Sequence, residues 1–314
     1  MYTDLFKTPV EQRAEWLKEV WLKKKGYPLD VDNPKTFTEK IQWYKTYYRH
    51  PDLHRIIDKV EFKQWVAEQN LPEAHDRALT AKLIRVWNSP EEVSFEGLPR
   101  QCVIKSNCRD NGQWIAVVKD WKHYDVESLE KEIKTEWFDI QKTLINSFCT
   151  GYHKMTPKVF VEEYLDYGDI VPEEFKFFCF NGEPLMVYTT KEHFKDKEGN
   201  IMNDISDYPF SFYDLNWKKM DIVYGNHPEY PDAPRPVHFE EMIDISRRLS
   251  ASFPFVRVDF FETPLQPYLA ELTFYPGGGW TPFHPASVDT WMGDLFQVPL
   301  RSNIDIICRK ETVL

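Results

Sequence analysis

Hydrophobic and polar positions change their period along the chain, which predicts a protein of mixed α and β structure. The pattern predicts helices over about 11–25, 36–48, 58–69, 125–147 and 238–250. Short apolar runs predict strands over about 82–87, 101–106, 113–119, 158–165, 174–181 and 184–190. The stretch 191–236 is rich in prolines and turn residues, so we expect it to be mostly loop.

Two further strand-like runs within 255–274 flank a proline-containing turn and predict a β-hairpin. Arg257 and Asp259 are two residues apart and share one face of the first strand, and Glu271 and Thr273 share one face of the second. Antiparallel pairing can therefore bring an arginine, two acids and a hydroxyl onto one sheet face. Oxygen ligands of this kind suit Mg²⁺, with phosphates completing its shell. The alternative is an ordinary solvated sheet face with alternating polar residues.

Composition limits the classes of function. The chain has 314 residues, 28% charged and 42% hydrophobic, which is typical of a folded protein with two or three lobes. A net charge of −11 without a sustained basic run argues against a general nucleic-acid or anionic-membrane binder. The N-terminus lacks a signal-peptide pattern, and no run approaches the roughly 18 apolar residues of a membrane span. We therefore expect a cytoplasmic protein.

The cysteines also point to a reducing compartment. There are five, scattered along the chain without a C-x-x-C pair, so we expect free thiols. Cys102 and Cys179 lie in apolar strand-like runs and are expected in the core.

Several lysines and acids near predicted strand ends are candidates for nucleotide binding. Lys105 ends a strand before the polar turn S-N-C-R-D-N-G, where a lysine and loop amides can bind phosphates. Lys59 lies at a helix start, and Lys176 is a single cation in an apolar strand. The strand over 158–165 ends in two acids, and such a segment can bind adenine through its backbone and ribose through a carboxylate. Each feature alone also suits a solvated surface.

The order of these parts is more specific than any one of them. A lysine at a helix start, a lysine before a polar loop, E-E-Y-L, a lysine on a strand, R-x-D and E-L-T-x-x-P-G resemble the ATP-grasp superfamily. The chain is most similar to the TupA-like branch, the teichuronopeptide-type ligases associated with cell-surface polysaccharides. The strings N-P-K-T-F-T-E-K-I-Q-W, F-K-F-F-C-F-N-G and F-P-F-V-R-V-D-F carry this resemblance over most of the chain.

The resemblance implies an α+β (α/β) ATP-grasp fold, in which two lobes grip ATP beside a helical N-terminal segment. The implied units are a mostly helical region over 1–78, a small lobe over 79–156 and a C-terminal lobe over 157–314. ATP and Mg²⁺ are the implied cofactors.

The resemblance also implies roles for individual residues. Catalytic charge would come from Arg257, Lys105 and Lys176. The residues implied to bind ATP are Lys59, Lys105, Arg109, Glu162, Glu163, Tyr164, Leu165 and Lys176. The implied metal ligands are Asp259, Glu271 and Thr273. The acceptor substrate would lie near Gly277, Gly278, Gly279, Trp280 and His284.

Two positions depart from the family pattern. The family loop usually resembles N-H-G-S-G-G, whereas this chain has N-C-R-D-N-G, in which Arg109 could supply compensating charge. Thr273 stands where many ATP-grasp enzymes have asparagine.

The implied activity is an ATP-dependent carboxylate–amine ligase that joins an amino acid to a uronic-acid-type sugar or polysaccharide precursor through an acyl phosphate. This chemistry needs positioning and charge rather than a protein nucleophile. A glycosyltransferase is the first alternative, although the D-x-D at Asp30–Asp32 lies in a Pro/Asn-rich loop. A catalytically impaired ATP-binding protein is the second.

Overall fold

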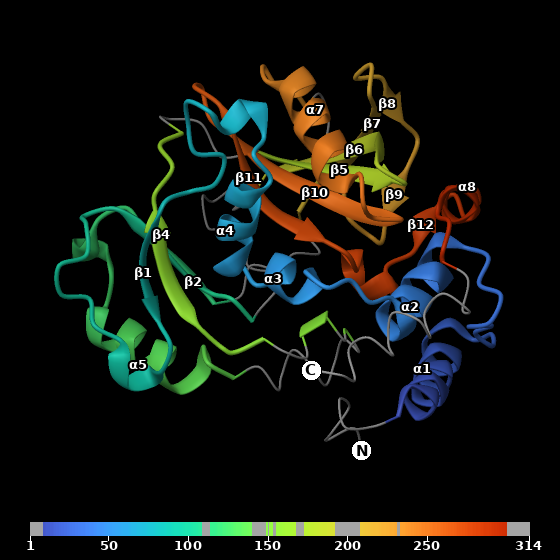
Figure 1. Cartoon of the computed structure of the whole chain (residues 1–314), viewed down its shortest axis with the longest axis horizontal. Coiled ribbons are helices and arrows are strands. Elements are labelled where there is room, and N and C mark those ends of the chain that lie inside the picture. Colours follow the sequence, from blue (N-terminus) through green and yellow to red (C-terminus); the bar gives the residue numbers. More distant parts are fainter. Residues whose placement is uncertain are drawn as a thin grey trace.

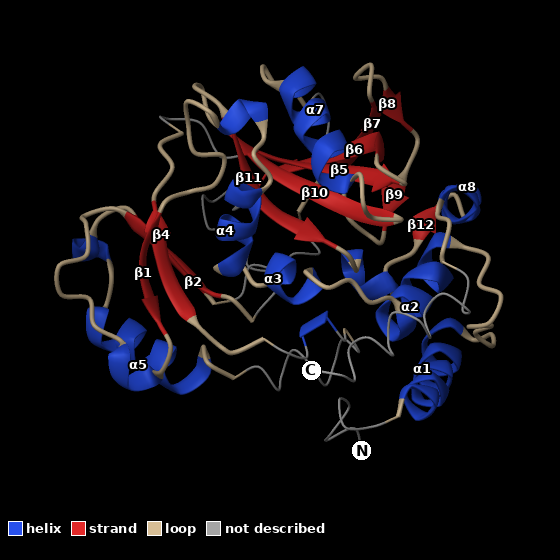
Figure 2. Cartoon of the chain, in the orientation of Figure 1, coloured by secondary structure: helices blue, strands red, loops and turns tan. Residues whose placement is uncertain are grey.

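Two antiparallel sheets organise the chain, with short helices between and around them (Figures 1 and 2). The computed structural model describes residues 9–108, 114–139, 149, 151–152, 155–167, 173–191, 208–230 and 233–299. The helices are α1 (Val10–Lys25), α2 (Phe37–Tyr47), α3 (Leu53–Ile57), α4 (Glu61–Glu68), α5 (Val126–Glu136), α7 (Phe239–Ser250) and α8 (Ser287–Leu295).

The smaller sheet has four strands in the order β1-β4-β2-β3. Its strands are β1 (Leu83–Trp87), β2 (Cys102–Ser106), β3 (Ile115–Val118) and β4 (Val159–Glu163). Helix α5 packs on it because Leu129, Ile133 and Trp137 join the buried strand residues in one cluster. The helix expected over 125–147 ends at Glu136, and 140–148 lies outside the described residues.

The larger sheet has six strands in the order β11-β10-β5-β6-β7-β8. Its strands are β5 (Glu173–Phe180), β6 (Glu183–Lys191), β7 (Phe210–Asp214), β8 (Lys219–Met220), β10 (Phe255–Glu262) and β11 (Pro267–Thr273). The hairpin expected near the C-terminal end is confirmed, with Asp259 opposite Glu271 and Arg257 opposite Thr273. The expectation of loop over 191–236 is wrong for β7, β8 and β9 (Val223–Tyr224).

Tertiary pairing explains these additional strands. Phe210 and Phe212 alternate along β7 and pack against Tyr188 of β6, with ring centroids 4.9 and 5.2 Å away. A five-residue strand gains its stability from such cross-strand contacts, which the local sequence does not disclose.

The two faces of the larger sheet have different roles. Val258 and Phe260 of β10 point to the face that α7 covers, where Phe177 packs on Phe239 at 5.6 Å and on Phe260 at 5.7 Å. Phe255, two residues from Arg257, points to the opposite face. There it meets Phe37 of α2 at 4.9 Å.

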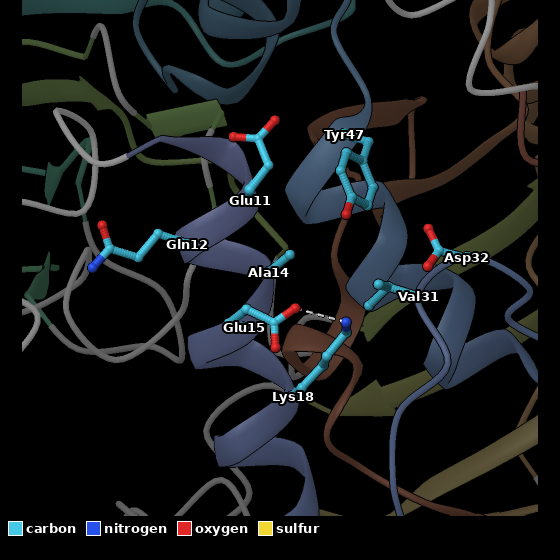
Figure 3. A pocket seen from close by; sticks show the side chains of 8 residues that line it. All are labelled: Glu11, Gln12, Ala14, Glu15, Lys18, Val31, Asp32 and Tyr47. Atoms are coloured by element: carbon cyan, nitrogen blue, oxygen red, sulfur yellow. Dashed lines mark hydrogen bonds and ion pairs between the residues drawn. The ribbon is translucent and has the colours of Figure 1, made fainter.

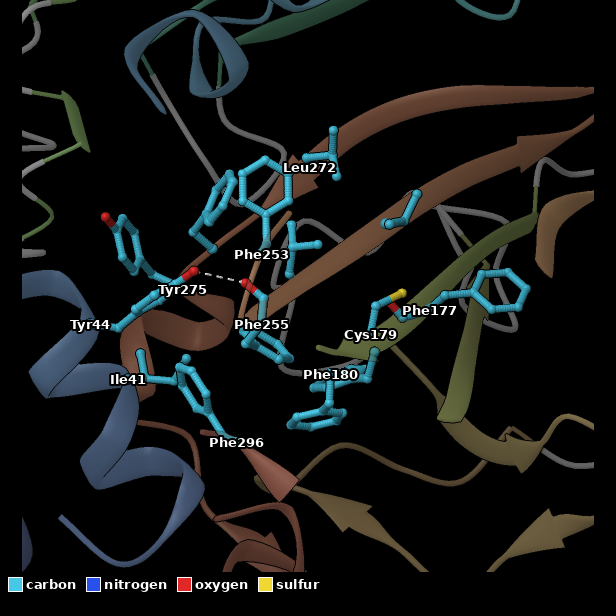
Figure 4. Packing of buried hydrophobic residues seen from close by; sticks show 14 of the residues in the cluster. Ile41, Tyr44, Phe177, Cys179, Phe180, Phe253, Phe255, Leu272, Tyr275 and Phe296 are labelled. Atoms are coloured by element: carbon cyan, nitrogen blue, oxygen red, sulfur yellow. Dashed lines mark hydrogen bonds between the residues drawn. The ribbon is translucent and has the colours of Figure 1, made fainter. Parts of the chain in front are cut away.

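Helix α2 closes the apolar end of this second face (Figure 4). Thr36 and Glu39 form a capping box at its start. The Tyr44 hydroxyl donates to the carbonyl oxygen of Phe255 over 3.1 Å, and Phe296 stacks edge-on against Tyr44. The aromatic end of the face is therefore sealed, which leaves the polar residues of β10 at the other end.

The connection between the sheets places β4 in the smaller sheet, paired with both β1 and β2. The expected boundary at 157 falls just before this strand, and the division into three units stays a prediction. The final elements are β12 (Phe283–His284), paired with β9, and α8, a helix that the sequence pattern did not predict. No helix in the described part of the chain is long and apolar enough to cross a membrane.

Candidate active site

Three charged residues line up across neighbouring strands of the larger sheet. Lys176 on β5 is the register partner of Asp259 on β10, and Asp259 is the partner of Glu271 on β11. Directly opposed residues in a sheet point to the same face at close range. The structure therefore brings together a lysine and two acids that are up to 95 positions apart in the sequence (271 − 176).

Arg257 joins this row through a two-point contact. Its Nε donates to Oδ1 of Asp259 over 2.7 Å, and its Nη2 donates to Oδ2 over 2.5 Å. Nη2 also donates to the Thr273 hydroxyl over 3.0 Å, and the guanidinium lies 5.6 Å from the ring centre of Tyr188. The side chain of Asp259 is 1% exposed, so this ion pair is fully desolvated.

Glu271 is the more accessible of the two acids, with 33% of its side chain exposed. Its Oε1 accepts from the Thr273 hydroxyl over 3.0 Å, and its Oε2 lies 3.2 Å from Nζ of Lys59. Lys59 precedes α4, so the contact joins the N-terminal helices to β11. Thr273, expected as a third metal ligand, bridges Arg257 and Glu271 in this structure.

Electrostatics hold the two acids differently. Burial raises the pKa of Asp259, and the charges of Arg257 and Lys176 oppose that rise. Burial also acts to raise the pKa of Glu271, but the charges of Lys59, Lys176 and Arg257 hold it well below its usual range. Glu271 is therefore a carboxylate at neutral pH, as a metal ligand must be.

Lys176 is fixed between two acids on the same sheet face. It pairs with Glu174, two residues earlier on β5, and its Nζ lies 3.5 Å from Oδ2 of Asp259. Although burial acts to lower it, these carboxylates raise the pKa of Lys176 well above its usual value. Glu174 was not among the predicted site residues. Glu174 could have been found from its spacing of two residues from Lys176 on a predicted strand, which places both side chains on one face.

A second charged cluster lies at the smaller sheet. Glu162 of β4 accepts from Lys63 over 2.8 Å through Oε2, and its Oε1 lies 2.5 Å from Nζ of Lys105. Burial opposes ionisation of Glu162, but Lys105 and Lys63 together lower its pKa to about 2. Lys105 Nζ also lies 5.9 Å from the ring centre of Phe261 on β10. Lys105 therefore faces the larger sheet.

The other expected hinge residues lie at or just beyond the end of β4. Glu163 is bonded to the residue before β1, because its Oε1 accepts from the backbone N–H of Lys82 over 2.8 Å. The ring of Tyr164 lies under Nζ of Lys119 at 5.6 Å, and Leu165 is half-buried beside it. The adenine and ribose contacts expected of this segment stay a prediction.

The glycine-rich turn after β11 packs against α2. Gly277 and Gly278 have φ values of +55° and +59°, and the carbonyl oxygen of Gly278 accepts from Nζ of Lys45 over 2.7 Å. Trp280 lies between two cations, with Nζ of Lys45 at 4.7 Å and Nζ of Lys24 at 5.0 Å from its ring centre. The N-terminal helices therefore form one wall beside the expected acceptor side.

One expected site residue lies apart from these clusters, and another is not described by the structure. His284 is exposed on β12, where it pairs with Val223. Arg109 lies outside the described residues. The acids of the D-x-D motif occupy a turn in which Oδ1 of Asp30 accepts the N–H groups of Asp32 and Asn33.

The donor set at the larger sheet fits a magnesium ion that is shared with phosphates. Asp259 and Glu271 place carboxylates on adjacent strands; both oxygens of Asp259 accept from Arg257 here, so Glu271 is the carboxylate open to a metal. Mg²⁺ is commonly bound by one or two carboxylates plus substrate phosphates. In the described part of the chain, no three His, Cys, Asp or Glu side chains gather as a complete protein cage. The residues thus suit a metal that arrives with a nucleotide.

A separate cavity of about 420 Å³ lies between α1 and the end of α2 (Figure 3). Its lining includes Glu11, Glu15, Asp32 and Tyr47, and Lys18 is already paired with Glu15 at 2.8 Å. None of the predicted site residues lines this cavity. We therefore place the candidate site at the two charged clusters.

The described cysteines agree with the expected free thiols. Among the described residues, Cys102, Cys108, Cys149 and Cys179 are buried and form no disulfide, and Cys102 and Cys179 belong to the two cores as expected. Burial raises the pKa of Cys102 to about 11, so this thiol is not a nucleophile at neutral pH.

Comparisons with solved structures give distant matches to ligases. A D-alanine–D-alanine ligase from Bacillus anthracis is 15% identical, with 82% of this chain and 73% of that chain covered and a TM-score of 0.40. The complex of this ligase with ATP is 14% identical with a TM-score of 0.37; 70% of this chain and only 54% of that chain are covered. The macrocyclase MdnC from Microcystis aeruginosa MRC, bound to the precursor peptide MdnA, is 13% identical with a TM-score of 0.36 over 93% and 73% of the chains.

These structural likenesses are too low to decide the activity, and no curated protein matches the chain. The decisive comparison is with protein families, in which residues 39–297 match the TupA-like ATPgrasp family. The match spans both charged clusters and the α+β sheets that carry them. The chain belongs to the TupA-like ATP-grasp family.

Proposed function

We propose that this protein is an ATP- and Mg²⁺-dependent carboxylate–amine ligase. The observation that carries the proposal is the row of Lys176, Asp259 and Glu271 across three strands, with Arg257 and Lys59 in contact with its acids. Two acids suited to a metal, surrounded by cations suited to phosphates, are what phosphoryl transfer from ATP requires. Membership of an ATP-grasp family supports the same chemistry.

The two clusters would divide the work of holding the nucleotide. Lys105 and the segment Glu162–Leu165 would bind it from the smaller sheet, Lys176 and Arg257 from the larger sheet, and Lys59 from the N-terminal helices. The position of Lys105 supports this arrangement, because its Nζ lies 5.9 Å from the ring centre of Phe261, on the same strand as Arg257 and Asp259. When bound, Mg²⁺ would neutralise the phosphate oxygens while Asp259 and Glu271 hold it.

The reaction would proceed in two steps. A substrate carboxylate attacks the γ-phosphate of ATP, which forms an acyl phosphate and releases ADP. An amine then attacks the acyl carbon, and phosphate leaves as the amide bond forms. Arg257, Lys105 and Lys176 would stabilise the negative charge that develops on the transferred group.

For the substrates, we propose a uronic-acid-type sugar, free or within a surface-polysaccharide precursor, as the carboxylate and an amino acid as the amine. The support is the resemblance of the chain to ligases associated with cell-surface polysaccharides, together with its membership of the TupA-like ATP-grasp family. The structure favours neither a glycosyltransferase nor a catalytically impaired ATP-binding protein. Asp30 and Asp32 form a local turn rather than a metal site at a strand end, which weakens the glycosyltransferase alternative.

The test measures ADP and phosphate release with Mg-ATP across a panel of uronic-acid sugars crossed with amino acids, with product masses recorded. ADP that appears only with a matched pair, and a product one water lighter than the sum of the two, would establish the ligase. ATP binding without turnover across the panel would instead favour the impaired ATP-binding protein. Hydrolysis or transfer of a nucleotide sugar without ADP would favour the glycosyltransferase.

A further inference from the structure

Asp58 and Asn107 form a buried contact between the N-terminal helices and the smaller sheet. Asp58 directly precedes Lys59, and Asn107 directly follows β2. Nδ2 of Asn107 donates to Oδ2 of Asp58 over 2.9 Å, and the two residues are 0% and 2% exposed. This contact belongs to neither charged cluster described above.

Asn107 is held on all sides. Its Nδ2 also donates to the carbonyl oxygen of Thr156 over 3.0 Å, and its Oδ1 accepts from the backbone N–H of Lys158 over 2.7 Å. Its own backbone N–H donates to the carbonyl oxygen of Lys158 over 3.0 Å. The amide therefore has one allowed orientation and joins the end of β2 to the segment that leads into β4.

Asp58 is held with equal completeness. Its Oδ1 accepts from the N–H of Val60 over 2.8 Å and of Glu61 over 3.3 Å, which satisfies the open start of α4. Its Oδ2 lies 3.2 Å from Nζ of Lys158 in addition to the bond from Asn107. Because both oxygens of this buried carboxylate are bonded, the backbone at Asp58 and the start of α4 are held in one position.

Each residue of this contact lies close in sequence to a lysine that is proposed to bind phosphate. The next residue after Asp58 is Lys59, whose Nζ reaches Glu271 of β11 over 3.2 Å. Two residues before Asn107 is Lys105, which reaches Glu162. One hydrogen bond thus lies between the backbone that carries Lys59 and the strand that carries Lys105.

We propose that Asp58 and Asn107 are positioning residues that hold Lys59 in the geometry in which it and Lys105 contact the same nucleotide phosphates. The proposal rests on the function proposed above. Neither residue touches the nucleotide, because both side chains are consumed by protein contacts. Their effect passes through Lys59.

The chain offers a matched control. Lys158 pairs with two acids, Asp58 at 3.2 Å and Glu61 at 2.9 Å, but only Asp58 also binds Asn107. Asp58→Asn places an amide donor opposite the Asn107 amide and removes one of the two carboxylates that pair with Lys158. Glu61→Gln removes the other carboxylate that pairs with Lys158 and leaves the contact between Asp58 and Asn107 intact.

The experiment titrates Mg-ATP onto the full-length chain by calorimetry and records thermal unfolding of each variant. We expect Asp58→Asn to weaken Mg-ATP binding by about 10-fold or more, because misplacement of one charged contact has an effect of this size, and Glu61→Gln to change it less than about twofold. Equal loss in both variants, or no loss in Asp58→Asn, would overturn the positioning role. If Asp58→Asn does not fold, Asn107→Ser takes its place, with the same expected loss and the same overturning result.

Two further variants separate positioning from simple loss of stability. If Asp58 acts through Lys59, Asp58→Asn adds little to the loss caused by Lys59→Met, whereas fully additive losses would contradict the proposal. The exchange Asp58→Asn with Asn107→Asp restores one amide–carboxylate bond and is expected to recover Mg-ATP affinity several-fold over Asp58→Asn alone. No recovery in a folded exchange variant would count against it. Failure of the unaltered protein to bind Mg-ATP would overturn the proposed function itself.

Discussion

Arg257 and Asp259 form a two-point ion pair on one strand, with Nε–Oδ1 at 2.7 Å and Nη2–Oδ2 at 2.5 Å. Each side chain is the main charge partner of the other, and both are buried. Substitution of either one therefore leaves the other buried without its main partner. The proposed metal ligand Asp259 is therefore a structural residue as well. Glu271, on the neighbouring strand and one-third exposed, is not constrained in the same way.

Replacement of Asp259 by Asn is expected to lower the free energy of unfolding by about 3–5 kcal/mol, because the buried Arg257 loses its two-point charge partner. Urea denaturation monitored by circular dichroism measures this loss. Arg257→Met combined with Asp259→Leu removes both charges and is expected to recover most of the stability. A double variant as unstable as Asp259→Asn would contradict the explanation.

Replacement of Glu271 by Gln separates chemistry from folding. We expect ADP formation to fall on the order of 10²–10³-fold, because a charged transition-state contact is lost. The free energy of unfolding is expected to change by about 1 kcal/mol or less, since the side chain is partly exposed. Glu262→Gln, on the adjacent strand β10 but bonded to His238, is the control and keeps full activity. Normal turnover in folded Glu271→Gln would refute the metal assignment.

The lowered pKa of Glu162 predicts that the free energy of unfolding falls at acid pH. Its pKa falls from 4.5 to about 2 in the folded protein, so the unfolded chain binds a proton more readily than the folded one between these values. The stabilisation is complete above about pH 5 and is lost as the pH falls through the folded pKa, a change of about 3 kcal/mol.

The measurement for Glu162 is the free energy of unfolding between pH 6 and pH 2.5. Glu162→Gln is expected to flatten this dependence, and Lys63→Met is expected to move it to higher pH because one of the two stabilising cations is lost. An unchanged pH dependence in Glu162→Gln would show that other acids control acid unfolding.

The glycine-rich turn can be tested with a pair of matched substitutions. A Cβ at Gly279, where φ is +68°, would lie 2.4 Å from Nε2 of Gln42 and 2.7 Å from Cγ2 of Ile41. A Cβ at Gly26, where φ is +80°, would meet nothing within 4 Å. Both alanines carry backbone strain of about 1 kcal/mol, but only Gly279→Ala adds a clash of about 1–3 kcal/mol.

Thermal unfolding compares the two glycine variants. The larger fall in midpoint temperature is expected for Gly279→Ala. Equal falls in midpoint temperature would mean that the turn after β11 can move away from α2 without cost. The packing of α2 against this turn would then not hold Trp280 in place.

Some contacts of the site follow from the local residue pattern, and others depend on which strands lie side by side. The faces shared by Arg257 with Asp259 and by Glu271 with Thr273 follow from a period of two, and the register of the hairpin confirms them. The opposition of Lys176 to Asp259 depends on β5 lying beside β10, across more than 70 intervening residues. No local period contains that information.

Most helices and strands, the hairpin with its polar face and the family motifs can be recognised from the order of residues alone. Local sterics and side-chain alternation govern these features, and they act within a few residues. Other contacts became visible only in the folded chain: Glu162 lies between two lysines, Thr273 bridges Arg257 and Glu271, and Asp58 meets Asn107. Burial in a low-dielectric interior makes these long-range pairings energetically strong, and burial is a property of the folded chain.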